Sequence, residues 1–286
     1  YLQFRCTSSV TVLPRPVKDW YSQTVYLDEI DSSVDPPSAV DPAVPNTPQL
    51  PNQQREGLRT RIRAFGEVVL CSDFPTQLML IQLLAWIGLR PLLSDGRLSL
   101  LYIATLSLVD AAVLITLILW FLRYHGESAR RIFLGSRSIG REVRLGVLLV
   151  PGVVLFVLLT LTLIQHFAPW LHNVEENPLE SLLQTPRDAI IFGLVAIVAG
   201  GVREELQRAF ILHRFKEHLG GAPVGLVVFS VVFGLGHLIQ GWDAALVTTM
   251  LGVVWGVVFL SRRSVIAPIV SHTGFNVLEI VRHLSQ

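Results

Sequence analysis

The chain has 286 residues, of which 51% are hydrophobic and 16% are charged, and its mean hydropathy is +0.52. This composition leaves too little polar surface for a soluble globular protein of the same length, so we expect a membrane protein. The net charge of +1 gives no whole-protein electrostatic field for capturing nucleic acid, and no nucleic-acid partner is expected.

The first 54 residues differ from the rest of the chain. They carry an acidic patch and a run of prolines (Asp28, Glu29, Asp31, Asp35, Asp41; Pro36, Pro37, Pro42, Pro45, Pro48, Pro51). Such a segment buries too little apolar surface to offset the entropy cost of ordering. We expect a disordered tail over residues 1–54 and a helical membrane bundle over residues 55–286. The two cysteines, Cys6 and Cys71, give no basis for a disulfide framework.

Apolar stretches follow the tail. A bilayer core of roughly 30 Å requires about 20 apolar residues per helix. Seven stretches approach this length, at about residues 75–93, 98–122, 145–168, 188–212, 222–239, 243–260 and 265–284. The sequence therefore predicts an all-α, polytopic membrane bundle of about seven spans, between six and eight. The first span is shortened by Arg90 and Pro91, and an interfacial helix is the alternative there.

Basic residues predict the orientation, because loops rich in Lys and Arg stay in the cytoplasm. They gather before the first span and in every second loop after it (Arg55, Arg59, Arg61, Arg63; Arg123, Arg130, Arg131, Arg137, Arg141, Arg144; Arg214, Lys216; Arg262, Arg263). The acids Glu175, Glu176 and Glu180 lie in an intervening loop. We expect a multi-pass integral membrane protein with a cytoplasmic N-terminus.

Ionisable residues inside a span are expensive and mark a functional site or an internal ion pair. The fourth span contains Glu204, Glu205 and Arg208. Arg208 is an i,i+4 neighbour of Glu204 and an i,i+3 neighbour of Glu205, so one carboxylate can be neutralised while the other stays free. The alternative is an ion-pair cluster with no further role.

Two later spans carry histidines. The fifth ends in Phe233 and His237, and the seventh places His272 and Asn276 on one helix face. A lone histidine at a helix end is usually an interfacial residue, but three polar elements on three helices favour a shared site. Asp110 in the second span lacks such companions, and we interpret it as a structural hydrogen-bonding residue. The remaining histidines lie in loops or at helix ends and receive no role (His166, His172, His213, His218, His283).

The order of these elements resembles the CPBP family of membrane proteins, which includes type II CAAX prenyl endopeptidases and proteins linked to bacteriocin self-immunity. The resemblance covers about residues 185–286. Its three motifs are the pair Glu204 and Glu205 followed by arginine, Phe233 to His237, and His272 to Asn276. Family members commonly have three residues between the second glutamate and the arginine, whereas here only two intervene.

The resemblance implies peptide-bond hydrolysis inside the membrane, with Glu204, His237, His272 and Asn276 as catalytic residues. Glu204 would act as general base on a water held with His237, and His272 and Asn276 would stabilise the oxyanion. Glu205, Arg208 and Phe233 would support them. A rival metalloprotease mechanism makes Glu204, His237 and His272 ligands of a zinc ion. The sequence leaves open whether zinc or no cofactor is used.

The implied partners are the lipid bilayer and a membrane-anchored or prenylated peptide or protein. Two other interpretations stay open: a non-catalytic immunity or scaffold protein with the same fold, and a proton or ion pathway. The enzyme interpretation imposes a condition on the helices. Along ideal vertical helices His237 and His272 would lie at different depths, so it requires strong tilt, an earlier start to the last helix, or a break at Gly234 or Gly236.

Overall fold

The computed structural model describes residues 50–175 and 177–285 of the chain. All regular structure in this part is helical, and the only extended pairing is one isolated bridge between Leu92 and Leu98, so the all-α fold class is confirmed. The predicted disordered tail lies outside the described residues, except that the first described helix begins at Leu50.

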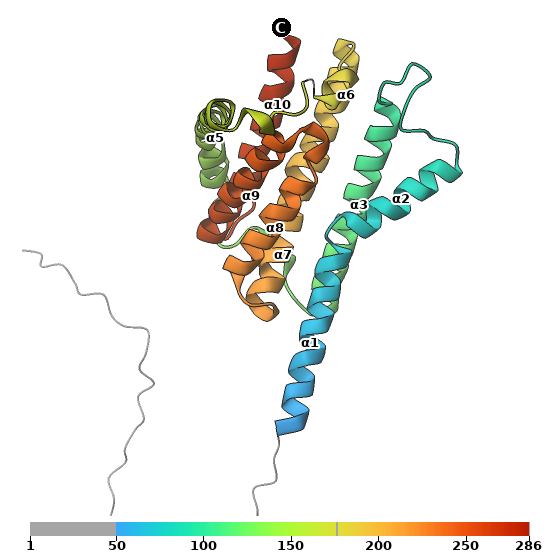
Figure 1. Ribbon diagram of the computed structural model, residues 1–286. Coiled ribbons are helices and arrows are strands. Elements are labelled where there is room, and N and C mark those ends of the chain that lie inside the picture. Colours follow the sequence, from blue (N-terminus) through green and yellow to red (C-terminus); the bar gives the residue numbers. More distant parts are fainter. Residues whose placement is uncertain (1–49, 176, 286) are drawn as a thin grey trace, which may run out of the picture. The chain divides into compact units, whose positions relative to one another are not determined.

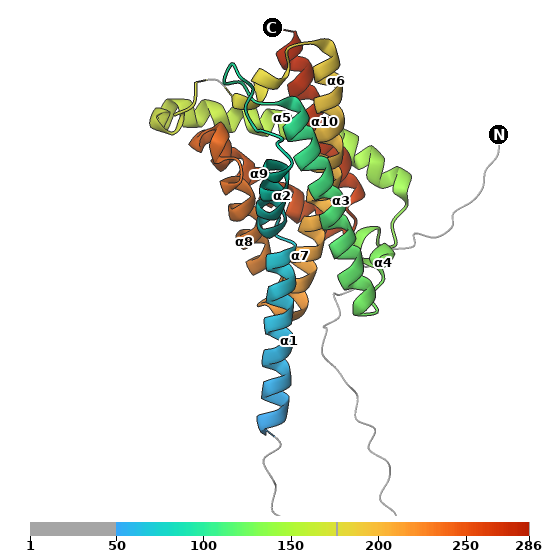
Figure 2. The same cartoon turned by 90° about the vertical axis from the view of Figure 1, so that its right-hand side faces the viewer.

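The first half of the described chain runs through five helices (Figures 1 and 2). Their bounds are Leu50–Leu70 for α1, Phe74–Trp86 for α2, Leu100–Tyr124 for α3, Ala129–Phe133 for α4 and Ile139–Phe167 for α5. The side chains of Ser99 and Ser128 accept hydrogen bonds at the starts of α3 and α4, which satisfies backbone N–H groups there. Two 3₁₀ turns, η1 (Pro169–Leu171) and η2 (Pro178–Leu182), follow α5.

The second half forms a more continuous path. The helix α6 (Pro186–Val195) passes without interruption into a π-helical segment, η3 (Ala196–Arg203), and then into α7 (Glu204–His218). The helix α8 (Ala222–Leu235) returns in the opposite direction and ends in the 3₁₀ turn η4 (Leu238–Gln240). The chain then descends along α9 (Trp242–Arg262) and rises along α10 (Ile266–Leu284), as Figure 1 shows.

The helices lie close to the predicted apolar stretches, but seven spans are not confirmed. Within the described residues three helices, α3, α5 and α9, are long and apolar enough to cross a membrane, and α1 and α2 would make a fourth if the two, bent by 42°, form one span. The others fail for identifiable reasons. The helix α8 has only 14 residues, about 21 Å of rise, and α7 is rich in charged residues.

The helix α1 was not expected as a separate element. The sequence places arginines at Arg59, Arg61 and Arg63, and these break up the apolar run that would signal a span. The structure shows a helix of 21 residues that ends at Leu70, and Asp73 then adopts a left-handed backbone conformation with φ of 79° before α2. The predicted first span therefore corresponds to α2 alone.

Glycines allow the helices of the second half to approach one another closely, as expected for helices in lipid. Gly234 faces Ala245 and Thr249 across the α8–α9 contact, so closely that a Cβ atom there would overlap with both. Gly146 of α5 likewise faces Ala267 and Val270 of α10. These contacts hold α8 closely against α9 and α5 closely against α10.

Candidate active site

Glu204 is the first residue of α7 and follows the π-helical segment directly. A π-helical turn inserts extra backbone into a helix, changes the direction of the side chains that follow, and is frequent at functional sites. Gly200 and Gly201 in this segment are weak helix formers, which makes the wider turn easier to adopt. The Glu204 side chain is 14% exposed, whereas Glu205 beside it is 1% exposed.

Arg208 forms an ion pair with Glu205 and lies fully buried. Its guanidinium group is also 5.1 Å from the ring centroids of Phe229 and Phe233 and 5.7 Å from that of Trp255. An arginine cation over aromatic faces is attracted by their negative charge density. Arg208 is thus neutralised by Glu205, and no ion pair joins it to Glu204 in the described part of the chain.

His272 of α10 lies between the two glutamates. Its Nδ1 atom is 2.8 Å from Glu205 Oε1, at hydrogen-bond distance, and its Nε2 atom is 3.8 Å from Glu204 Oε2. A carboxylate only accepts hydrogen bonds, so the contact with Glu205 requires a proton on Nδ1 and directs Nε2 toward Glu204. One histidine therefore joins the first motif of the sequence to the third.

Trp255 of α9 supports His272 from one side. The two rings stack with centroids 3.8 Å apart and planes 18° apart, and the indole Nε1 donates a hydrogen bond to Ser271 Oγ at 3.3 Å. Trp255 is 1% exposed. Sequence analysis did not find this residue, because a tryptophan within an apolar helix has the appearance of an ordinary core residue.

His237 follows the end of α8 and lies on the other side of Phe233. The Phe233 ring is 5.1 Å from the ring of His237 and 6.3 Å from the ring of His272. His237 Nδ1 is 2.9 Å from the carbonyl oxygen of Phe233. The carbonyl can only accept, so Nδ1 carries the proton and Nε2 is the acceptor nitrogen. The helix α8 ends at Leu235, so the chain leaves the helix between Gly234 and Gly236, where the enzyme interpretation requires a break.

Asn276 lies one turn beyond His272 on α10 and faces the π-helical segment. A Cβ atom at Gly200 would stand 2.8 Å from Asn276 Nδ2, and one at Gly201 would overlap with Thr273. The absence of side chains at these two glycines therefore allows α10 to pack directly on η3. The Asn276 amide group is held beside the turn that precedes Glu204.

The structure thus brings five of the predicted residues into direct contact and places two beside them. The connected group comprises Glu204, Glu205, Arg208, Phe233 and His272. His237 is linked to it through Phe233, and Asn276 through the backbone of η3. A shallow apolar hollow of about 510 Å³ lies elsewhere, on α3 around Leu108 and Leu117, and none of the predicted residues lines it.

The proposed zinc ligands do not fit a metal site as they stand. Zinc requires its ligands within about 2.0–2.3 Å of one point. Among the described residues no group of three or more His, Cys, Asp or Glu is arranged to hold a metal ion. His272 Nδ1 is occupied by Glu205, and no ion pair brings His237 near Glu204 in this part of the chain.

A second buried polar cluster lies on the opposite face of η3 and α7. Arg203 Nη1 contacts Asp73 Oδ2 at 3.1 Å and Gln207 Oε1 at 3.3 Å, and Arg203 Nη2 is 3.9 Å from Asp110 Oδ2. Asp73 and Thr76 also lie beside the Asp110 carboxyl group. Arg203 reaches α3 across the bundle and pairs with Asp110, and the structural hydrogen-bonding role of Asp110 stays a prediction.

Fold and geometry together define a helical membrane protein with a buried glutamate, histidine and arginine site on its last four helices. Residues 186–278 match the family model described as Type II CAAX prenyl endopeptidase Rce1-like. The match confirms the resemblance of this region to the CPBP and CAAX proteases. No curated protein and no solved structure was found to match the chain.

Proposed function

We propose that the protein is an intramembrane endopeptidase that hydrolyses a peptide bond with a water activated by Glu204. The observation that carries this proposal is that the two adjacent glutamates have different partners and different exposure. Glu205 is neutralised by Arg208, whereas among the described residues no arginine forms an ion pair with Glu204, which is partly exposed and lies 3.8 Å from His272 Nε2. A carboxylate free of a guanidinium partner is the better base of the two.

His237 complements this base. With its proton on Nδ1, its Nε2 atom is free to accept, and in the proposed arrangement the attacking water donates one hydrogen to His237 Nε2 and the other to Glu204. In the proposed step the water oxygen bonds to the substrate carbonyl carbon and its proton passes to Glu204. Glu204 then returns this proton to the leaving amine as the C–N bond breaks.

His272 and Asn276 would stabilise the oxyanion of the tetrahedral intermediate. Because Nδ1 is bonded to Glu205, His272 offers a donor at Nε2 only as the imidazolium. In the proposed form, protonated His272 and Arg208 would lie beside the negative charges of Glu204 and Glu205. Buried charges are tolerated when they are paired in this way. The Asn276 amide adds a neutral donor one helical turn away.

The substrate class follows from the family match together with the membrane setting. We infer a membrane-anchored protein or peptide, and a prenylated one in particular, presented to the site from the side where the arginine-rich loops lie. That side would be the cytoplasm, with the N-terminus on it. The active protein would then act on substrates that reach the bilayer from within the cell.

The test is cleavage of membrane-anchored peptides by purified protein in lipid nanodiscs, with prenylated and unprenylated versions compared. Glu204→Gln should reduce the cleavage rate by about 10²- to 10⁴-fold, because a general base is removed while size is kept. Its thermal stability should match the wild type. A stable Glu204→Gln protein that cleaves at the wild-type rate would contradict the assignment, and a wild-type protein that cleaves none of the peptides would favour a scaffold role.

A further inference from the structure

The helix α1 carries two different faces. One face is buried against the bundle through Ala64, Glu67, Val68 and Cys71. The opposite face exposes four large apolar side chains at i, i+4, i+7 and i+11, a spacing that aligns them in one stripe. We call this the α1 stripe; it comprises Leu58, Ile62, Phe65 and Val69, which are 59%, 63%, 59% and 40% exposed.

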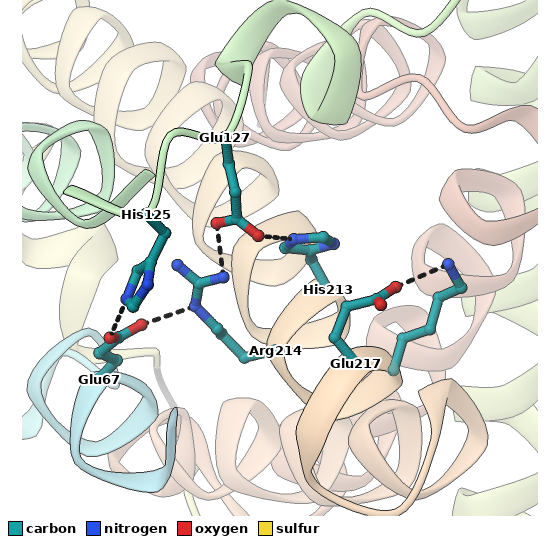
Figure 3. A network of polar contacts seen from close by, with 7 residues as sticks. Glu67, His125, Glu127, His213, Arg214 and Glu217 are labelled. Atoms are coloured by element: carbon teal, nitrogen blue, oxygen red, sulfur yellow. Dashed lines mark hydrogen bonds and ion pairs between the residues drawn. The ribbon is translucent and has the colours of Figure 1, made fainter. Parts of the chain in front are cut away.

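A polar network fixes which face of α1 points outward (Figure 3). Glu67 Oε2 accepts a hydrogen bond from Arg214 Nε at 2.6 Å, and Glu67 Oε1 lies 2.6 Å from His125 Nε2. Arg214 also contacts Glu127 at 2.6 Å, and His213 contacts the same carboxylate at 2.7 Å. Because α1 cannot rotate without breaking these contacts, the α1 stripe is held away from the bundle.

The network also fixes the level of α1 along the bundle. His125 directly follows the end of α3, and the exposed aromatic residues Trp120 and Tyr124 lie in the last two turns of that helix. Exposed Trp and Tyr residues are typical of the membrane–water interface. From the level of Glu67, α1 continues past the end of α3 toward its N-terminus, as both views show (Figures 1 and 2).

The apolar side chains of the α1 stripe lie at or beyond the membrane–water interface, where contact with water is unfavourable. Leu58 lies nine residues before Glu67, about 14 Å along the helix. The headgroup layer of each leaflet is only roughly 5–8 Å thick. An upright helix would carry Leu58 through this layer into water, so docking of the whole α1 stripe in the layer requires α1 to incline toward the bilayer surface.

The charges around the α1 stripe indicate which kind of surface it can bind. Arg59, Arg61 and Arg63 are exposed on α1, and the same end of the bundle exposes further arginines (Arg123, Arg130, Arg131, Arg137, Arg141, Arg263). The acids at this end are already engaged: Glu67 and Glu127 by Arg214, Glu142 by Arg262, and Glu217 by Lys216. The unmatched charge is therefore positive. Arg59 and Arg61 flank the α1 stripe, so pairing it with a second copy would bring like charges together.

We propose that the α1 stripe docks into the headgroup layer of an anionic lipid surface, with Arg59 and Arg61 binding lipid phosphates at its edges. An apolar stripe bordered by arginines is the pattern of helices that lie in the membrane interface. Each arginine near an anionic surface strengthens binding by about fivefold, so the two together contribute roughly 25-fold. This docking is independent of catalysis, and it would hold the cytoplasmic end of the bundle against the bilayer.

The experiment uses the full chain in nanodiscs of phosphatidylcholine with or without phosphatidylglycerol. A spin label is attached at Ile62→Cys on the α1 stripe or at Arg63→Cys beside it, in a Cys6→Ser background, since Cys71 is buried. Collision rates with oxygen and with a water-soluble nickel complex report lipid and water contact. With phosphatidylglycerol present, the label at 62 should be shielded from nickel and the label at 63 should stay accessible.

The charge requirement is tested by Arg59→Gln with Arg61→Gln, which should lower the ratio of docked to undocked label at 62 by roughly 25-fold. Arg130→Gln with Arg131→Gln on α4 is the matched control and should leave the ratio unchanged. Three outcomes would overturn the proposal: equal nickel access at 62 and 63, equal shielding at both as in a membrane span, or shielding at 62 that ignores lipid charge and is accompanied by label–label broadening from a second copy.

Discussion

Trp255 and His272 stack face to face, with ring centroids 3.8 Å apart, and Ser271 Oγ accepts the indole hydrogen bond that fixes the tryptophan. The stack places an electron-rich ring over the imidazole that bridges the two glutamates. An aromatic face attracts a cation more strongly than a neutral ring. Trp255 therefore favours the protonated His272 that the proposed oxyanion site needs.

Replacing this ring gives the first prediction. Trp255→Leu should lower kcat by about tenfold with little change in KM, because a cation–π contact of about 0.5–2 kcal/mol is lost at His272. Trp255→Phe keeps an aromatic face and should retain most of the activity. Phe259→Leu, one turn further along α9, is the control. Equal activity of Trp255→Leu and wild-type protein in steady-state peptide cleavage would show that the stack has no catalytic effect.

The second prediction concerns the buried ion pair of Glu205 with Arg208. Glu205→Gln leaves a buried guanidinium without its carboxylate and should destabilise the protein by about 3–5 kcal/mol. The double variant Glu205→Gln with Arg208→Met removes the unpaired charge and should recover part of that loss. Thermal unfolding in detergent measures both.

The exposed pair of Glu279 with Arg282 on α10 is a matched control for this measurement. Glu279→Gln should change stability by less than about 0.5 kcal/mol, because exposed ion pairs contribute little. If Glu205→Gln unfolds at the wild-type temperature, Glu205 is not needed to balance Arg208.

Much of the helical order could be predicted from the sequence. The stretches predicted at 98–122, 145–168 and 243–260 fall on α3, α5 and α9, because long apolar runs bounded by polar residues define such helices. The polar residues of the site were found because each is costly inside an apolar helix. The predicted seven spans are not confirmed, because length and apolar composition do not identify α7 and α10, whose polar side chains pair with each other.

Other features leave no local signal in a sequence. The π-helical segment before Glu204 depends on how Gly200 and Gly201 pack against α10, and periodicity cannot register one extra residue in a turn. The contacts of Arg214 with Glu67 and Glu127 join residues 147 and 87 positions apart. His213 was given no role from the sequence, although its ring contacts Glu127. Such pairings are decided by the tertiary structure.

The third prediction concerns acid stability at Glu127, in the loop after α3. Partial burial alone would raise the pKa of Glu127, but hydrogen bonds from His213 and Arg214 outweigh it and hold the pKa below its usual value of 4.5. A carboxyl whose pKa is lowered by folding contributes stability above its unfolded pKa and loses it as pH falls through the folded pKa. Stability should thus decrease below about pH 4.5.

Thermal unfolding measured across acidic pH checks this expectation, with Glu127→Gln as the comparison. The variant lacks the titrating carboxyl, so its stability should fall less steeply below pH 4.5 and should already be reduced at neutral pH. Asp95, which is exposed and pairs with Arg97 in the loop after α2, is a suitable control through Asp95→Asn. Identical pH profiles for the wild type and Glu127→Gln would show that the network does not depend on this charge.

The last prediction separates the position of Asn276 from the stability of the bundle. A methyl group at Gly200 would stand 2.8 Å from Asn276 Nδ2, the end of a flexible side chain, and would contact nothing else except Asn276 Cγ at 4.0 Å. Gly200→Ala should therefore cost little stability, because the amide can move aside. A displaced Asn276 would lose its position beside the turn that precedes Glu204. We therefore expect kcat to fall by about 10²-fold, as for the loss of one oxyanion donor.

Alanine substitutions at two other glycines, Gly201 and Gly193, serve as comparisons for Gly200→Ala. At Gly201 the added methyl would also press on the Cβ of Thr273 at 3.2 Å, so Gly201→Ala should lower stability by about 1–3 kcal/mol. At Gly193 of α6 nothing lies within 4 Å, and Gly193→Ala should be neutral or stabilise the helix by about 1 kcal/mol with full activity. Peptide cleavage and thermal unfolding are measured on all three. A fully active Gly200→Ala would mean that Asn276 acts from a different position or takes no part in catalysis, since the displaced amide could no longer reach an oxyanion beside Glu204.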